Sequence, residues 1–110
     1  IDARRMEVYA TLFDGNLKPL SETRPEIITP ESFATELTDA DVCFCGDGAE
    51  KCREVIRSPR ASFLGHVTPV AAEMVPMAER AYAERRFVDT AYFEPFYLKE
   101  FVATTPRKKI

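Results

Sequence analysis

The sequence is poor in the side chains that build metal sites, with one histidine, His66, and three cysteines. Structural zinc sites need four Cys or His ligands in suitably spaced pairs. Cys43 and Cys45 stand two apart in an apparent strand, so both point to one face, whereas Cys52 belongs to the next helical segment. Three cysteines also cannot all pair within one chain. We therefore expect buried, reduced thiols, with a Cys-x-Cys metal site as the less favoured alternative.

Long apolar runs and an excess of positive charge are also missing. No run approaches the roughly 20 residues that a membrane-spanning helix needs, and no basic-then-apolar leader is visible. The net charge of -3 argues against binding nucleic acid by bulk electrostatics. The basic residues 107–109 favour a solvated end over a binding patch. We expect a cytoplasmic protein that does not enter a membrane.

A length of 110 residues allows a single domain over residues 1–110, and a hydrophobic content of 45% is enough for a core. The chain begins with Ile1 and enters an alternating apolar stretch directly. We interpret it as a segment of a longer polypeptide.

The first third of the chain predicts a β-hairpin. Residues 6–13 alternate apolar and other side chains with the period of a strand. Asp14, Gly15 and Asn16 tolerate the positive φ of a tight turn. The returning strand runs from about Leu17 towards Ile28, weakened by two prolines.

The rest of the chain alternates helices and strands. Residues 29–39 predict a short helix with a threonine N-cap and a proline in its first turn. Residues 42–45 form an apolar run typical of a parallel-type strand covered on both faces. A helix over 49–56 and a brief strand over 61–64 follow. This order predicts an α/β fold, a mixed sheet that starts with a β-hairpin and has helices packed on its faces.

The last third predicts one long helix and an aromatic tail. Thr68 and Pro69 open the helix, and an apolar stripe follows from Val70 to Tyr82. Pro76 falls inside that stripe and should kink or split the helix. Residues 92–98 are so rich in aromatics that we expect them to dock on another surface.

Gly46-Asp47-Gly48, between the predicted strand and helix, is the candidate cofactor-binding loop. Glycines let a backbone approach phosphate, and a helix N-terminus favours negative charge. The loop lacks the lysine of a P-loop and the third glycine of a dinucleotide fingerprint, and Asp47 would repel phosphate unless Mg²⁺ intervened. A plain tight turn is the favoured interpretation.

Arg4, Arg5 and Glu7, with Asp2 beside them, are candidate interaction residues. We expect the two arginines at the start of a strand, pointing to opposite faces. Solvated arginines on an edge are at least as plausible on physical grounds. No spacing of carboxylates, hydroxyls or thiols indicates a catalytic or metal site, so we do not expect an enzyme.

Several stretches nevertheless resemble one known family. Ile1 to Ala10 closely resembles the Asp-Ala-Arg-Arg-x-Glu-Val-Tyr segment that opens the second half of TsaB/YeaZ proteins. Further similarities follow in the right order over 44–49 with Lys51 and Cys52, over the Thr68-Pro69 helix, and over 91–98. The last of these looks like a Bacteroidetes-type version of the family's Pro-x-Tyr-Leu ending.

The resemblance implies a ribonuclease-H-like lobe of the actin-like ATPase fold, the C-terminal one of two. It implies a non-catalytic scaffold for N6-threonylcarbamoyladenosine formation in tRNA, homologous to the glycoprotease-type subunit TsaD but lacking its metal histidines. The implied partners are TsaD and TsaE homologues, bound mainly through the N-terminal lobe that this chain lacks. The resemblance also implies a homodimer of the full-length protein, indirect contact with tRNA and a possible adenine nucleotide in the complex.

Two alternative hypotheses about the function remain. One is an ATP-binding lobe of an actin or sugar-kinase type of enzyme that uses Gly46-Asp47-Gly48. The other, less favoured, is an active peptidase related to the glycoprotease family.

Overall fold

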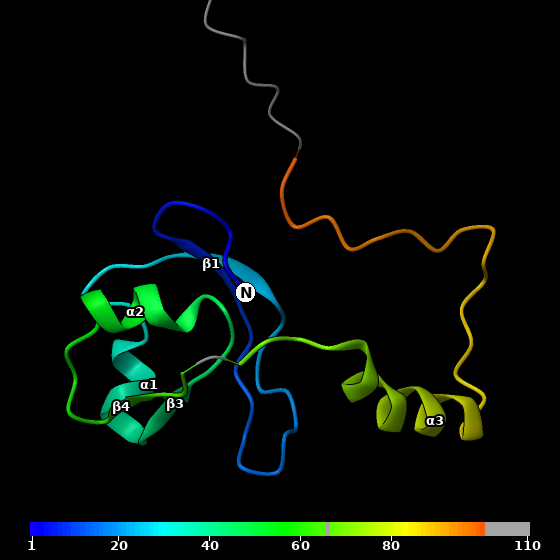
Figure 1. Cartoon of the computed structure of the whole chain (residues 1–110), viewed down its shortest axis with the longest axis horizontal. Coiled ribbons are helices and arrows are strands. Elements are labelled where there is room, and N and C mark those ends of the chain that lie inside the picture. The colour runs from blue at the N-terminus through cyan, green and yellow to red at the C-terminus, as the bar shows by residue number, and fades with distance from the viewer. Residues whose placement is uncertain (66, 101–110) are drawn as a thin grey trace, which may run out of the picture.

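The computed structural model describes residues 1–65 and 67–100 (Figure 1). Its elements in chain order are β1 (Glu7–Ala10), β2 (Arg24–Ile27), α1 (Ala34–Asp39), β3 (Val42–Phe44), α2 (Ala49–Val55), β4 (Ala61–Phe63), the 3-10 helix η1 (Ala71–Met74) and α3 (Val75–Ala83). The predicted small α/β fold is confirmed. Predictions about His66 and residues 107–109 lie outside the described residues. Within those residues, no helix is long and apolar enough to cross a membrane.

The strands form two separate two-stranded sheets, and the prediction of one mixed sheet is wrong for the described residues. β1 and β2 are antiparallel, with Glu7 opposite Ile27. β3 and β4 are parallel, with Val42 opposite Ala61. The sheets stay separate because the other edge of β1 is already occupied: the Tyr9 N–H donates to the Ile1 carbonyl at 2.8 Å.

The hairpin itself is confirmed, although its turn is larger than predicted. The Asp14 carboxylate accepts the backbone N–H groups of Asn16 and Lys18 at 2.8 and 2.9 Å, which closes the turn. An isolated antiparallel bridge between Phe13 and Pro19 follows. Beyond it the Leu12 N–H donates to the Ser21 hydroxyl at 2.9 Å, and the regular pairing resumes at β2, where Pro25 lies opposite Tyr9.

The core lies between the hairpin, the two short helices and one face of the β3–β4 pair. Its five buried members come from β1, the end of β2, α1 and α2, and each is at most 7% exposed: Val8, Ile28, Leu37, Cys52 and Ile56. Three phenylalanines extend it. Phe44 meets Phe33 edge-on at 5.3 Å between ring centroids and stacks on Phe63 at 5.0 Å.

No described element covers the opposite face of the β3–β4 pair, so the prediction of a strand buried on both faces is wrong for the part of the chain that the structure describes. Val42 and Phe44 pack towards the core, and Cys43 and Cys45 alternate with them and are exposed. The prediction of buried thiols is therefore wrong for these two cysteines and confirmed for Cys52. The reason is that the buried side chains of α1 and α2 pack on the same face.

Both predicted threonine-proline helix starts are wrong. Thr29 belongs to a turn in which its N–H donates to the Ser32 hydroxyl at 2.9 Å, and α1 begins only after Phe33, whose φ of 60° is left-handed. Val70 has an extended backbone, so the second helical segment begins only at Ala71. The predicted effect of Pro76 is confirmed, because the segment splits into η1 and α3 with this proline in the first turn of α3.

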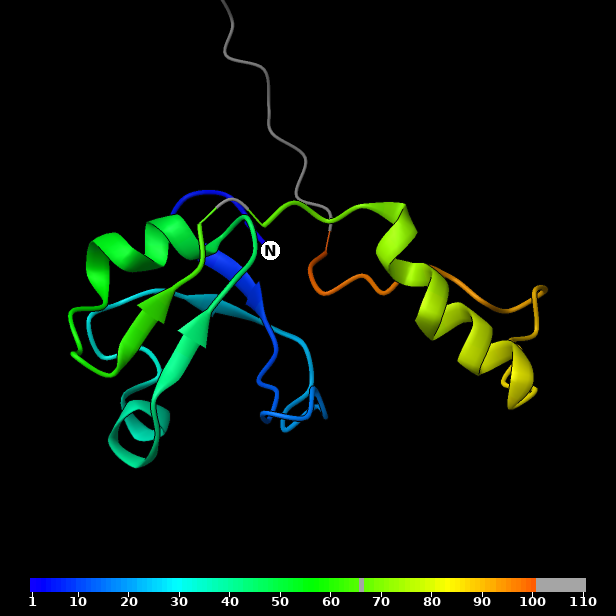
Figure 2. The same ribbon diagram turned by 60° about the horizontal axis from the view of Figure 1, so that its bottom comes forward.

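The segment of η1 and α3 lies away from the rest of the chain, and the tail that follows it returns towards β1 (Figure 2). The radius of gyration is 17.4 Å, against about 13 Å for a compact domain of this length. α3 contains no buried residue. The aromatic tail docks only in part: it lines a shallow hollow beside Tyr9 and Thr23, yet Phe96 stays 77% exposed.

Candidate functional site

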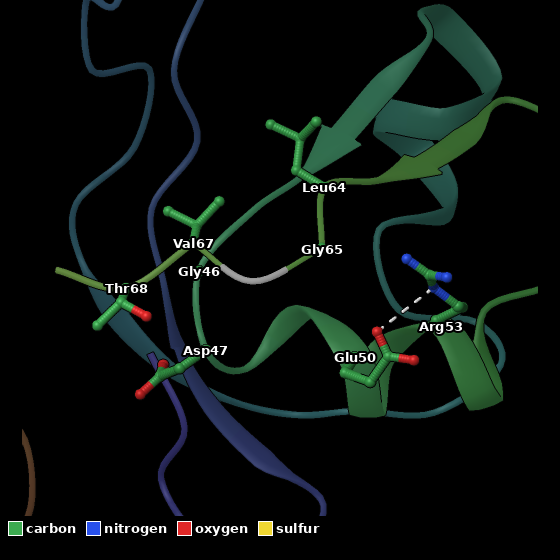
Figure 3. Close-up of a pocket in the computed structure, with 8 residues that line it drawn as sticks. All are labelled: Gly46, Asp47, Glu50, Arg53, Leu64, Gly65, Val67 and Thr68. Atoms are coloured by element: carbon green, nitrogen blue, oxygen red, sulfur yellow. Dashed lines mark ion pairs between the residues drawn. The ribbon is translucent and has the colours of Figure 1, made fainter.

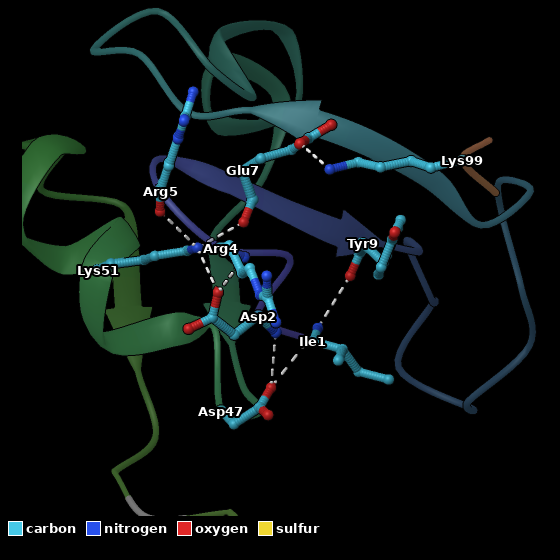
Figure 4. Close-up of polar contacts among 9 residues, drawn as sticks. All are labelled: Ile1, Asp2, Arg4, Arg5, Glu7, Tyr9, Asp47, Lys51 and Lys99. Atoms are coloured by element: carbon cyan, nitrogen blue, oxygen red, sulfur yellow. Dashed lines mark hydrogen bonds and ion pairs between the residues drawn. The ribbon is translucent and has the colours of Figure 1, made fainter. Parts of the chain in front are cut away.

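Lys51 is the centre of the most extensive polar network in the described residues (Figure 4). It extends from α2 and is only 17% exposed. Its Nζ donates to the Asp2 carboxylate at 2.6 Å, to the Arg5 carbonyl at 2.8 Å and to the Glu7 carbonyl at 2.5 Å. An ammonium has three donors, so this geometry uses all of them and ties α2 to the start of the chain.

The segment that Lys51 holds is a tight turn with Arg4 and Arg5 at its tip. Their φ values of 70° and 49° are left-handed, as in the favoured two-residue hairpin turns. For a non-glycine residue this conformation costs about 1–2 kcal/mol. Two contacts offset that cost: the Arg4 N–H donates to the Asp2 carboxylate at 2.7 Å, and Lys51 binds the Arg5 carbonyl.

The predicted placement of the two arginines at the start of a strand is therefore wrong. They lie in the turn that precedes β1, and both are exposed. Within residues 1–65 and 67–100, neither guanidinium forms an ion pair. Glu7, the third predicted interaction residue, instead pairs with Lys99, whose Nζ also lies 5.7 Å from the centroid of the Tyr9 ring. The arginines can contact a partner, whereas the Glu7 carboxylate is engaged within the chain.

Asp2 is held in its charged form. The hydrogen bond from Lys51 lowers the pKa of the Asp2 carboxyl below its ordinary value, and the Arg4 N–H lowers it further. Deprotonated Asp2 neutralises Lys51 within the network.

The Gly46-Asp47-Gly48 loop joins the same network. The Asp47 carboxylate accepts the Asp2 N–H at 2.8 Å. Gly46 has a φ of 104°, which side chains rarely adopt. A Cβ on Gly48 would lie 2.9 Å from Val8 Cγ1, so only glycine lets α2 begin this close to β1. These contacts account for the loop as a tight turn that packs α2 on the start of the chain.

Gly46 and Asp47 also line an open hollow of about 620 Å³ (Figure 3). It lies beyond the carboxyl ends of β3 and β4, the edge at which parallel sheets commonly bind ligands. Asp47 and Glu50 make its lining acidic. Arg53 is the basic residue among the side chains that line the hollow. It pairs with Glu50 at 3.6 Å and lies over the Phe63 ring. This lining disfavours a bare phosphate, and nucleotide binding at the loop stays a prediction.

The described residues contain no group of three or more His, Cys, Asp or Glu side chains that could hold a metal ion. Burial raises the pKa of the Cys52 thiol, which keeps it protonated and poorly nucleophilic at neutral pH.

The role of Lys51 could not be predicted from the sequence. Its partner Asp2 is 49 positions away, and no local spacing connects them. The available signal is the resemblance, which includes both Asp2 and Lys51 without saying that they meet.

Comparisons of the chain with protein-family models, with curated proteins and with solved structures found no match. The fold and the network define a small α/β unit whose conspicuous polar groups bind one another.

Proposed function

We propose that this chain is the C-terminal, ribonuclease-H-like lobe of a TsaB/YeaZ-type protein of the actin-like ATPase fold. In this proposal it works in the cytoplasm as a non-catalytic scaffold for the formation of threonylcarbamoyladenosine in tRNA. Its partners are TsaD and TsaE homologues, bound mainly through an N-terminal lobe, and it brings no cofactor of its own.

The observation that carries the proposal is the meeting of the segments that resemble the family. The first of these segments, residues 2–9, contacts the segment over residues 44–52 at two places, through Lys51 and through Asp47. The aromatic tail follows, and Lys99 next to it pairs with Glu7. Separate stretches that depend on one another in space are expected to be retained together. These polar groups form hydrogen bonds within the chain, which suits a structural role better than a catalytic one.

A scaffold role is further supported by the exposed apolar surface. Met74 and Met77 near the start of α3 and Tyr92 and Phe93 in the tail are each at least 67% exposed. Contiguous exposed apolar side chains commonly mark surfaces that bind other proteins. Methionine and aromatic residues are enriched at such interfaces.

The test is a reconstituted modification reaction with the full-length protein and its TsaD and TsaE homologues. Mass spectrometry of nucleosides from the tRNA product measures threonylcarbamoyladenosine. We expect omission of the protein to abolish the product. Unchanged product without it would contradict the assignment.

The role of the turn can be tested in the same reaction. The double change Arg4→Gln and Arg5→Gln removes two charges whose side chains form no ion pair in the described residues. If the turn contacts a partner, product formation should fall several-fold while the thermal stability stays unchanged. A matched change, Arg57→Gln, alters an exposed arginine outside the turn and serves as the control.

The alternative function is an ATP-binding lobe, favoured by the position of Gly46 and Asp47 at the carboxyl ends of β3 and β4. Calorimetry of the full-length protein with ATP and Mg²⁺ distinguishes the two. Tight binding that is lost in Asp47→Asn, which keeps the oxygen that accepts the Asp2 N–H, would support the enzyme. Absence of binding by the isolated protein supports the scaffold.

A further inference from the structure

The exposed side of the β3–β4 pair is a mostly apolar surface that no described helix covers. We call it the open face and define it by Cys43, Cys45, Ser62 and Leu64. Cys43 lies directly opposite Ser62 in the parallel register. Cysteine and leucine are usually buried, yet both cysteines are exposed and Leu64 is 54% exposed. Parallel strands normally have helices on both faces, whereas residues 1–65 and 67–100 place a helix on only one face of this pair.

A second largely exposed apolar surface lies on the helical segment that follows β4; among the described residues, its Tyr82 ring meets Phe87 edge-on at 5.6 Å. We call it the α3 stripe and define it by Met74, Met77, Ala78, Ala81 and Tyr82. Their spacing of three, one, three and one residues places them on one side of a helix. Met77 is 73% exposed, and α3 has no buried residue. An amphipathic helix of nine residues is marginal by itself in water and gains stability by packing this side.

The two surfaces have comparable dimensions. Neighbouring strands lie about 4.8 Å apart, so a two-stranded face accommodates one helix of about 10 Å diameter. Three-residue strands are about 10 Å long, and the nine residues of α3 span about 13.5 Å. The open face has small side chains in its strands, whereas the α3 stripe has flexible methionines that can fill the gaps between them.

Both ends of the segment that carries α3 are attached to the same body. At one end, the Leu64 N–H donates to the Phe44 carbonyl at 2.9 Å. At the other end, Lys99 pairs with Glu7 and contacts the Tyr9 ring. Seven residues separate Phe63 from Ala71, one more than the 2–6 residues that are common between a strand and a helix in α/β units, so the connection is short. A tethered helix has an effective concentration in the millimolar range, which favours docking within the chain over docking on a second copy.

We propose that α3 is an arm that closes on the open face of its own β3–β4 pair, giving that pair helices on both sides. Figures 1 and 2 show the arm in its open position. Leu64, Gly65, Val67 and Thr68 lead into the arm, and they line the hollow that also includes Asp47 (Figure 3). Closure therefore changes the shape of that hollow. The proposal does not depend on the function proposed above.

Cross-linking in the full-length protein tests the arm directly. The variant Ala78→Cys introduces a thiol in the middle of the α3 stripe, and Glu79→Cys introduces one about 100° further around the helix, on its charged side. A short bismaleimide is added, and linked peptides are mapped by mass spectrometry in the monomer and dimer bands. We expect an intrachain link from position 78 to Cys43 or Cys45, at least several-fold more than from position 79. Equal linking from both positions, or links only between chains, would overturn the proposal.

The native thiols provide a second test that needs no new cysteine. Closure of the arm should slow the reaction of Cys43 and Cys45 with N-ethylmaleimide. Met77→Asp puts a charge in the α3 stripe and should speed both reactions several-fold, whereas buried Cys52 should react as slowly as before. Faster reaction of Cys52 as well would reveal unfolding, and the cross-linking result then decides. Unchanged rates at Cys43 and Cys45 with Cys52 still protected would overturn the proposal.

Discussion

Residues 1–65 and residues 67–100 use similar amino acids with opposite results. The first region buries Val8, Leu37 and Ile56 to 7% exposure or less, whereas the second leaves Met77 and Tyr92 at least 73% exposed. The difference lies in the partners that each element meets. In the first region, the strands and helices cover one another, and the core joins residues as far apart in sequence as Val8 and Ile56. In the second, one helix and an irregular aromatic run extend from the body with little to pack against, so apolar content alone does not produce a core.

The two regions also differ in how polar groups are used. In the first region, Lys51 and Asp47 bind the start of the chain and hold α2 in place. In the second, the ion pair between Arg86 and Glu84 is local and exposed, and such pairs contribute little. We therefore expect the first region to unfold as one unit and the second to open independently.

The largest effect should come from matched apolar truncations in the two regions. Ile56→Ala removes a side chain that is 3% exposed and should lower the free energy of unfolding by about 2–5 kcal/mol. Met77→Ala should cost less than about 1 kcal/mol, because α3 opens before the body unfolds. Urea denaturation of the full-length variants measures both. Equal losses would show that the two regions form one cooperative unit.

Removing the Lys51 ammonium should produce the next largest effect. Lys51→Met keeps most of the apolar stem but leaves the Asp2 carboxylate and two carbonyls without their donor. We expect a loss of about 1.5–3 kcal/mol, as for hydrogen bonds to charged groups. Lys18→Met, at an exposed position of the hairpin turn, is the control and should change little. An unchanged free energy of unfolding in Lys51→Met would mean that the network adds no stability.

A methyl group at Gly48 should disturb the contact between α2 and β1. The added Cβ would lie 2.9 Å from Val8 Cγ1 and 3.2 Å from the Asp2 nitrogen, and overpacking of this kind costs about 1–3 kcal/mol. Gly15→Ala places the same methyl group in open space and should stay within about 0.5 kcal/mol of the wild type. Thermal unfolding compares the two variants. Similar melting temperatures would argue against close packing at Gly48.

The smallest effect concerns pH and Asp2. Its folded-state pKa lies below the ordinary value of 3.8, so the carboxylate stabilises the fold above that value. This contribution disappears as the pH falls from 3.8 through the folded-state pKa. Asp2→Asn lacks it, so wild type and variant should differ near about pH 6 and converge at an acidic pH below the folded-state pKa. Chemical denaturation at both pH values checks this; a constant difference would contradict it.

Much of the secondary structure could be predicted from the sequence because its signals are local. The period-two alternation around Val8, the turn residues after Phe13 and the apolar run at Val42 identify the strands. The starts of two helices could not be predicted in this way. A threonine-proline pair suits a helix start, but the Ser32 hydroxyl binds the Thr29 N–H and delays α1 until Ala34.

The candidate site was predictable in its parts but not in its assembly. Arg4, Arg5 and Asp47 stand out by residue type, and the resemblance includes Lys51. Their geometry depends on contacts between residues more than 40 positions apart, which no local pattern reports. The turn at Arg4 and Arg5 also overrides the expected strand, because Lys51 and Asp2 stabilise its left-handed backbone.

Residue order alone determined the hairpin, the strand-helix alternation from Val42 to Phe63 and the break at Pro76, because backbone preferences and side-chain periodicity act over a few residues. Tertiary structure alone decided which face of the β3–β4 pair is covered and that Cys43 is exposed while Cys52 is buried. It also decided that Lys51 joins α2 to the first turn. Those outcomes depend on which elements approach in space, and a linear pattern of residues does not contain that information.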